Sequence, residues 1–271
     1  MSFWLRVNMF FRSFFLQAGW NYVKYQNLGF ALVMLPFLRR LYRQDPEALP
    51  SVMNRYLEAF NTHPVMASFC FGAMARMEES VARAQSVADY KEQVAEWMGA
   101  RRGLSITAAS IGDRLFWGTL KPLTLLLAIF IWMLLGVDFL EISMHPVPLL
   151  YAFTAGAAAF FVYNAVAQFV RWEGLQIGYE SDDKSCFGLT RFDWNRTIYN
   201  AKRIGIFFAV GLILFGVYRF FEGVQVDIHF IARAMLVLFF VMISFVTRRL
   251  RIPNVYLYIA AVIIFNIVCL I

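Results

Sequence analysis

Three groups of polar and aromatic residues are the part of this sequence best suited to binding a ligand. The first contains Gln17, Trp20, Asn21 and Gln26, and a helix over residues 3–38 would bring the three amides near one face. Amides donate and accept hydrogen bonds, and a tryptophan ring stacks on the apolar face of a sugar. The group therefore fits an uncharged polyhydroxylated ligand. The same residues also fit interhelical hydrogen bonds and an interfacial tryptophan.

The second group consists of Asn61, Thr62 and His63, followed by Pro64. Asn or Thr before a proline is typical of a turn or of the capping residue of a helix. A single histidine at such a turn is typical of a hydrogen-bonded residue rather than of a catalyst. This group predicts a turn that presents Asn61 and Thr62.

The third group contains Asp113, Arg114, Trp117 and Lys121, which border an apolar segment. Charged residues beside a membrane segment are costly, so they indicate either a functional site or a local ion pair. Both readings stay open at this point, the ion pair being Asp113 with Arg114 or with Lys121.

No arrangement of residues predicts covalent chemistry. The sequence has three cysteines in no metal-binding spacing, no phosphate-binding glycine loop, and no triad of nucleophile, base and acid. Glu78 and Glu79 form a carboxylate pair, which we expect on a solvated helix face. We predict no catalytic residue, no metal and no cofactor.

The elements that must position these groups lie in a membrane. Of 271 residues, 60% are hydrophobic and 16% are charged, whereas soluble domains have about 25% charged residues. Apolar stretches long enough to approach the width of a bilayer predict about five transmembrane helices. They cover residues 122–137, 147–170, 204–221, 230–246 and 254–271. The fold class is an all-α integral membrane protein.

The charged segments predict the orientation of these helices. Basic segments at 1–121, 171–203 and 248–251 alternate with acidic turns at 138–141 and 222–227. Lys and Arg are enriched on the cytoplasmic side of membrane proteins. A cytoplasmic N-terminus places every one of these segments on its preferred side.

Residues 1–121 form the second part of the predicted organisation. We expect amphipathic interfacial helices there, with Pro36 ending or kinking the first, and cytoplasmic helices at 46–60 and 74–98. The apolar segments 60–74 and 104–120 are too short to span, which predicts two re-entrant hairpins. Irregular backbone at membrane depth must be buried or line a polar cavity, so these hairpins mark the expected site.

The three groups resemble the IID subunit of the mannose/fructose/sorbose family of the bacterial phosphotransferase system (PTS). Residues 16–30, LQAGWNYVKYQNLGF, are similar to the family's FQGSWNxxxxQxxGF, and residues 60–64, FNTHP, to FFNTxP. Residues 112–122, GDRLFWGTLKP, are similar to GDPxFWGTxRP. The matches follow the family order over about the first 122 residues.

This resemblance implies a transport subunit with no phosphorylation site of its own. It implies pairing with a IIC membrane subunit, as a trimer of IIC–IID pairs in the bacterial inner membrane, and a hexose that a soluble IIB phosphohistidine phosphorylates during uptake. Further implied partners are IIA and membrane lipid, and nucleic acid is not among them. The residues that match the motifs and are predicted to line or shape the substrate site are Gln17, Trp20, Asn21, Asn61, Thr62, Asp113 and Trp117.

The sequence departs from the family pattern just before Asp113. The family has a loop rich in glycine and proline there, whereas this chain has Ile106, Thr107, Ser110 and Arg114 at four of those positions. Glycine permits close backbone approach and proline constrains a turn. The alternative function is therefore a degenerate, non-transporting scaffold or sensor for PTS proteins.

Overall fold

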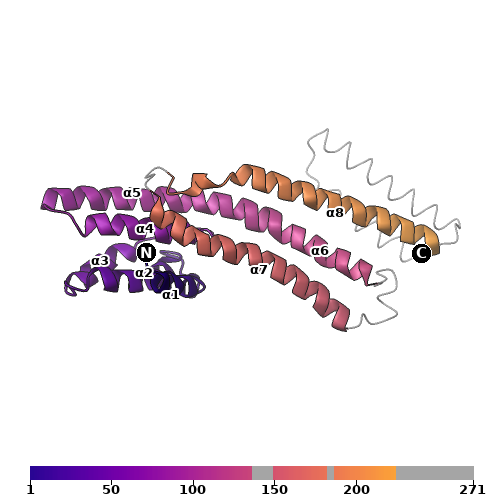
Figure 1. Cartoon of the computed structure of the whole chain (residues 1–271), viewed down its shortest axis with the longest axis horizontal. Coiled ribbons are helices and arrows are strands. Elements are labelled where there is room, and N and C mark those ends of the chain that lie inside the picture. The colour runs from indigo at the N-terminus through magenta and orange to yellow at the C-terminus, as the bar shows by residue number, and fades with distance from the viewer. Residues whose placement is uncertain (136–148, 182–185, 224–271) are drawn as a thin grey trace. The chain divides into compact units, whose positions relative to one another are not determined.

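The computed structural model describes residues 1–135, 149–181 and 186–223, and these are helical apart from short connections (Figure 1). The chain divides into two units, Met1–Val210 and Gly211–Ile271, and the description below concerns the first. The elements are α1 (Phe3–Ser13), α2 (Asn27–Leu41), α3 (Ala48–Tyr56), α4 (Ala67–Val81), α5 (Val87–Gly112), the π-helix η1 (Asp113–Leu120), α6 (Lys121–Leu134), α7 (Leu149–Glu180), the 3-10 turn η2 (Leu189–Arg191) and α8 (Trp194–Gly223).

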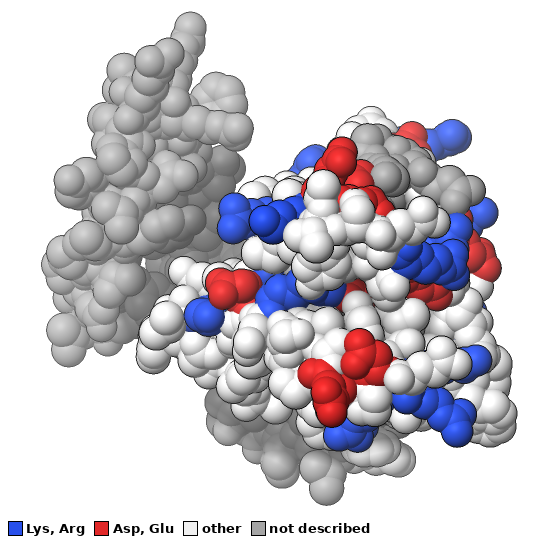
Figure 2. Space-filling view, turned by 90° about the vertical axis from the view of Figure 1, so that its left-hand side faces the viewer, with Lys and Arg blue, Asp and Glu red and all other residues white. Residues whose placement is uncertain are grey.

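Three of the described helices are long and apolar enough to cross a membrane. They are Val87–Leu134, which joins α5, η1 and α6 without a break, Phe153–Glu180 and Trp194–Tyr218. They contain most of the predicted spans 122–137, 147–170 and 204–221, whereas 230–246 and 254–271 lie outside the described residues. Figure 2, a view onto the end of the first unit that bears α1 to α5, shows charges of both signs on its surface. In the residues that the structure describes, the chain is an all-helical, multi-pass membrane protein.

The expected hairpin at 104–120 is wrong, because this segment is continuous helix from α5 through η1 to α6. Glycine and proline, which would turn the backbone, are absent from 104–111. Leu104, Ala108 and Leu115 are instead buried on one side of the helix. Burial of residues at this spacing stabilises a continuous helix. Segment 60–74 also forms no hairpin: after a turn at 61–66 it enters α4, which continues to Val81.

The single helix expected over residues 3–38 is also wrong. Helix α1 ends at Ser13, turns occupy 14–26, and α2 then runs through Pro36 to Leu41. Tyr25 has a left-handed backbone, φ 58°, which no helix accommodates. Gly29 allows the start of α2 to pack directly against the backbone of Leu16, because an added Cβ would collide with the Leu16 carbonyl. The predicted helix at 74–98 is likewise divided, and α5 begins after Ser86, whose hydroxyl accepts from the Asp89 N–H at 3.1 Å.

Helices α4 and α7 form the closest packing in the described chain. Ser68, Phe69, Cys70 and Phe71 of α4 are completely buried. Glycines allow the two backbones to approach: an added Cβ on Gly72 would meet the Leu175 carbonyl, and one on Gly178 would meet the Phe69 carbonyl. Small residues four apart are the common means of close helix packing in membranes. Helix α1 joins α7 through Arg6, which donates to the Trp172 carbonyl at 2.7 Å and pairs with Glu173 at 3.0 Å.

A buried carboxylate holds α2, α3 and α4 together, contrary to the solvated face expected for Glu78. Glu78 is fully buried, pairs with Arg55 of α3, and accepts from the hydroxyls of Tyr42 and Tyr56 at 2.7 Å each. Burial and the neighbouring Glu78 carboxylate raise the pKa of Tyr56 well above its usual value, so the hydroxyl stays a donor. A buried charge is tolerated only with such partners. The sequence could not identify these partners because they lie 22 to 36 positions before Glu78, on α3 and just after α2.

Candidate functional site

The first two sequence motifs meet through the side chain of Gln26. Its Nε2 donates to the Thr62 carbonyl at 2.9 Å, and its Oε1 accepts from the Thr62 N–H at 3.0 Å. The backbone N–H of Gln26 also donates to the Phe60 carbonyl at 2.8 Å. The side-chain amide of Gln26 therefore pairs with the backbone of Thr62 and joins the turn before α2 to the turn before α4. It is a structural group, and its burial leaves it no access to a ligand.

The second and third motifs meet around Thr62 and His63. The Thr62 hydroxyl donates to the Ser105 carbonyl of α5 at 2.9 Å. The His63 ring stacks on Phe116 of η1, with centroids 4.9 Å apart and planes 12° apart. Gly112 lies directly against His63, and an added Cβ there would collide with the imidazole. The fold thus brings the three motifs together in one buried cluster, which we call the motif junction: Gln26, Thr62, His63, Ser105, Gly112 and Phe116.

His63 is neutral in this junction. Burial, and secondarily the positive field of Arg171, lower the pKa of His63 to about 4. Its Nδ1 accepts from the Val65 N–H at 3.3 Å, which places the proton of the neutral ring on Nε2. His63 therefore acts as a hydrogen-bonded turn residue, as expected from the sequence.

Acidification is expected to destabilise the protein through His63. Because its pKa in the folded protein is about 4 and the usual value is 6.5, the stabilisation is complete above pH 6.5 and is lost as the pH falls towards 4. The loss amounts to about 3 kcal/mol by pH 4. Thermal unfolding of wild type and His63→Phe, which keeps a ring against Phe116, measures it. A variant whose melting temperature falls as steeply as that of wild type between pH 6.5 and 4 would contradict this assignment.

The seven predicted site residues divide into two sets. Two of them have side chains engaged in the fold: Thr62, described above, and Asn21, whose Oδ1 accepts from the Lys24 N–H at 2.8 Å and whose Nδ2 donates to Asn27 at 2.9 Å. The other five are exposed: Gln17, Trp20, Asn61, Asp113 and Trp117. The motifs thus combine inward residues that build the junction with outward residues that are free to contact a ligand or another subunit.

The charges of the third motif form no local ion pair. Among the described residues, Asp113 pairs with neither Arg114 nor Lys121, and all three are exposed. The Lys121 ammonium instead lies 5.0 Å from the centre of the Trp117 ring. Of the two readings, the local ion pair is therefore wrong.

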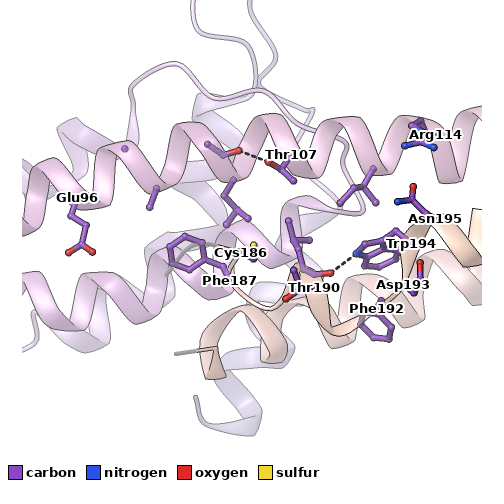
Figure 3. A pocket seen from close by; sticks show the side chains of 16 residues that line it. Glu96, Thr107, Arg114, Cys186, Phe187, Thr190, Phe192, Asp193, Trp194 and Asn195 are labelled. Carbon is purple, nitrogen blue, oxygen red and sulfur yellow. Dashed lines mark hydrogen bonds between the residues drawn. The ribbon is translucent and has the colours of Figure 1, made fainter. Parts of the chain in front are cut away.

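A groove of about 780 Å³ lies between α5 and the segment that leads into α8 (Figure 3). One wall consists of residues of α5 from Glu96 onward and of Arg114 in η1. The other wall is the segment from Cys186 to Asn195, which leads into the start of α8. Thr107, Thr190 and Asn195 are polar groups at its edge, and Phe187 and Trp194 form part of its apolar lining. None of the seven predicted residues lines this groove. Sequence reasoning missed it because its walls are some 80 residues apart in the chain and carry no shared motif.

The described residues contain no group of three or more His, Cys, Asp or Glu side chains that could hold a metal ion.

The fold and the motif junction define a multi-pass helical membrane protein whose N-terminal part is organised by three sequence motifs. A model of the PTS system mannose/fructose/sorbose family IID component matches residues 5–137, a region that includes all three motifs. Residues 5–137 thus match the IID family, as the motifs indicated.

Relatives of known name agree with this assignment. The chain is 33% identical over 171 residues to the mannose-specific EIID component of Escherichia coli strain K12, a match that covers 63% of this chain and 53% of that protein. It is 33% identical over 172 residues to the fructose permease IID component of Bacillus subtilis strain 168, covering 64% and 54%. A sorbose-specific EIID component from Klebsiella pneumoniae is 32% identical over 173 residues, covering 64% and 55%. The chain thus matches about half the length of these relatives.

Solved structures share the fold. A chain in the cryo-electron microscopy structure of the mannose transporter ManYZ with microcin E492 superimposes with a TM-score of 0.53 at 20% identity, covering 98% of this chain and 95% of that one. A second structure, described only as a membrane protein, superimposes with a TM-score of 0.56 at 26% identity, covering 78% and 70%.

Proposed function

We propose that this chain is the IID membrane subunit of a mannose-type PTS permease. In this proposal it forms with IIC the path for a hexose, and IIB phosphorylates the sugar during uptake. The observation that carries the proposal is that the three motifs behind the family resemblance converge on one junction. The names of the relatives favour transport over a non-transporting scaffold.

The seven predicted residues take two roles in this proposal. Asn21 and Thr62 shape the site by holding the turns around the junction. Gln17, Trp20, Asn61, Asp113 and Trp117, which are exposed, are the candidates for contact with sugar or with IIC. Amide, carboxylate and indole groups are the ones that hydrogen-bond and stack against a pyranose.

The assembly and location follow from the same proposal. IIA and IIB are soluble partners, the IIC–IID pairs form a trimer, and the complex lies in the bacterial inner membrane. The N-terminus is cytoplasmic, because the basic segments 1–121 and 171–203 then lie on the side that favours Lys and Arg. This chain supplies no phosphorylated residue.

Uptake of labelled mannose, fructose and glucosamine tests the proposal. The host lacks its own mannose-type permease and carries this chain with its neighbouring IIC and IIAB genes. Asp113→Asn is expected to reduce uptake tenfold or more, because a hydrogen bond to a charged group contributes about 1.5–3 kcal/mol. Trp117→Leu is expected to reduce uptake as well, because it removes the ring that would stack on the sugar. Both side chains are exposed, so the amount of folded protein in the membrane should not change.

The matched control is Glu92→Gln, which removes an exposed carboxylate from α5 far from the third motif. Its uptake should equal that of wild type. Unchanged uptake in both Asp113→Asn and Trp117→Leu would show that these residues do not contribute to transport. Absence of uptake by wild type, despite a stable complex with IIC, would favour the scaffold instead.

A further inference from the structure

Two cations on different helices each lie against an aromatic ring four residues earlier. The Lys121 ammonium lies 5.0 Å from the centre of the Trp117 ring, and the Arg203 guanidinium lies 5.7 Å from that of Tyr199. Both rings are mostly exposed, 58% for Trp117 and 62% for Tyr199. A cation over an amphipathic ring is an arrangement suited to the boundary between water and lipid.

The two pairs lie at the same level along neighbouring helices. Leu123 of α6 lies 3.8 Å from the position of a Cβ on Gly205 of α8, and the Phe130 and Phe208 rings are 5.3 Å apart. Residue numbers increase together along these contacts, so the two helices are parallel at this point. Lys121 and Arg203 each precede the first contact by two residues, which places them within about one turn of each other in height.

Both cations point away from the contact between the helices. Two residues correspond to about 200° of rotation around an α-helix. If Leu123 and Gly205 face each other, Lys121 and Arg203 lie on the outer sides of α6 and α8. Their exposure agrees with this, whereas Gly205 and Phe208 are half-buried.

Each cation is also the last charge before a long uncharged stretch. No charged residue occurs at 122–134 after Lys121, or at 204–218 after Arg203. Exposed apolar side chains follow at once, among them Leu125 and Ile206. Neither cation pairs with a carboxylate of the described residues. The adjoining surface therefore matches a molecule with an anionic head and apolar chains.

We infer that Lys121 and Arg203, each of which lies beside an aromatic ring, bind the headgroups of anionic phospholipids. The phosphate lies against Lys121 or Arg203, and the acyl chains lie along the exposed apolar residues that follow. The two pairs together mark the level of the headgroup layer on α6 and α8.

Native mass spectrometry of the full chain, purified in detergent and titrated with phosphatidylglycerol or phosphatidylcholine, tests this inference. Each Lys or Arg near an anionic surface contributes about 1 kcal/mol, so Lys121→Gln and Arg203→Gln should each weaken phosphatidylglycerol binding roughly fivefold. The double variant should weaken binding at both sites, each roughly fivefold, because the two cations lie on the outer sides of different helices and contact different lipids. Binding of phosphatidylcholine should change little.

The matched control is Arg102→Gln, which removes an exposed cation from the same continuous helix about 25 Å from Lys121. An equal loss of phosphatidylglycerol in this variant, or no loss in the double variant, would overturn the inference. Photoactivatable phosphatidylglycerol supplies a test on wild type that does not depend on variant folding. Cross-links are expected in peptides containing 117–121 and 199–203. Cross-links confined to other peptides would overturn the inference.

Discussion

Replacing Glu78 by alanine is expected to lower the free energy of unfolding by about 3–5 kcal/mol, which is the usual cost of leaving the other member of a buried ion pair without its partner. Arg55 would keep its charge in a site where its side chain is only 10% exposed. The hydroxyls of Tyr42 and Tyr56 would each lose their acceptor as well. Helices α2, α3 and α4 would then separate more easily. Thermal unfolding in detergent, with α-helical circular dichroism as the signal, measures the change.

Glu58→Ala is the matched control for this prediction. Glu58 pairs with Lys24 at 3.6 Å, and the two side chains are 50% and 40% exposed. Exposed pairs contribute about 0–1 kcal/mol, so this variant should unfold close to the wild-type temperature. Equal melting temperatures for Glu78→Ala and Glu58→Ala would show that the buried cluster does not hold the three helices together.

Gly72→Ala is expected to destabilise the protein by about 3 kcal/mol, although alanine is the better helix former. An added Cβ would collide with the Leu175 carbonyl and would lie 2.7 Å from the Tyr179 backbone nitrogen. These are backbone atoms of α7, so no side chain can rotate to make room. Helices α4 and α7 must therefore move apart, and their buried contacts must loosen. The melting temperature and the yield of folded protein measure this effect.

Gly99→Ala is the corresponding control on an open helix surface. No atom lies within 4 Å of the position of its added Cβ. Alanine stabilises a helix by up to about 1 kcal/mol relative to glycine, so this variant should be as stable as wild type or slightly more so. A similar loss of stability in both variants would mean that the glycines are needed for something other than the approach of α4 and α7.

The part of the fold that depends on local sequence was predictable. The apolar stretches around 122–137, 147–170 and 204–221 correspond to candidate membrane helices, because a bilayer requires a continuous apolar segment of defined length. The turn at Asn61–Pro64 was predictable for a similar reason, since proline and capping residues act on their immediate neighbours. The resemblance to the family rested on three short motifs, and the family model matches residues 5–137, which contain all three.

Segments whose conformation depends on distant residues were predicted wrongly. A helix over 3–38 agrees with the local pattern, but the backbone N–H of Gln26 donates to the Phe60 carbonyl, and its side chain bonds to Thr62, 36 positions away. The hairpin at 104–120 rested on segment length alone. The burial of Leu104, Ala108 and Leu115 against other helices makes a continuous helix more favourable.

The sequence by itself determined that this protein lies in a membrane and which family it resembles, because composition and motifs are local properties. Only the tertiary structure decided which motif residues face inward and which outward. Asn21 and Thr62 form hydrogen bonds within the fold, whereas Asp113 and Trp117 are exposed. The physical reason is that orientation depends on contacts between residues such as His63 and Phe116, which are 53 positions apart and pack only after the chain has folded.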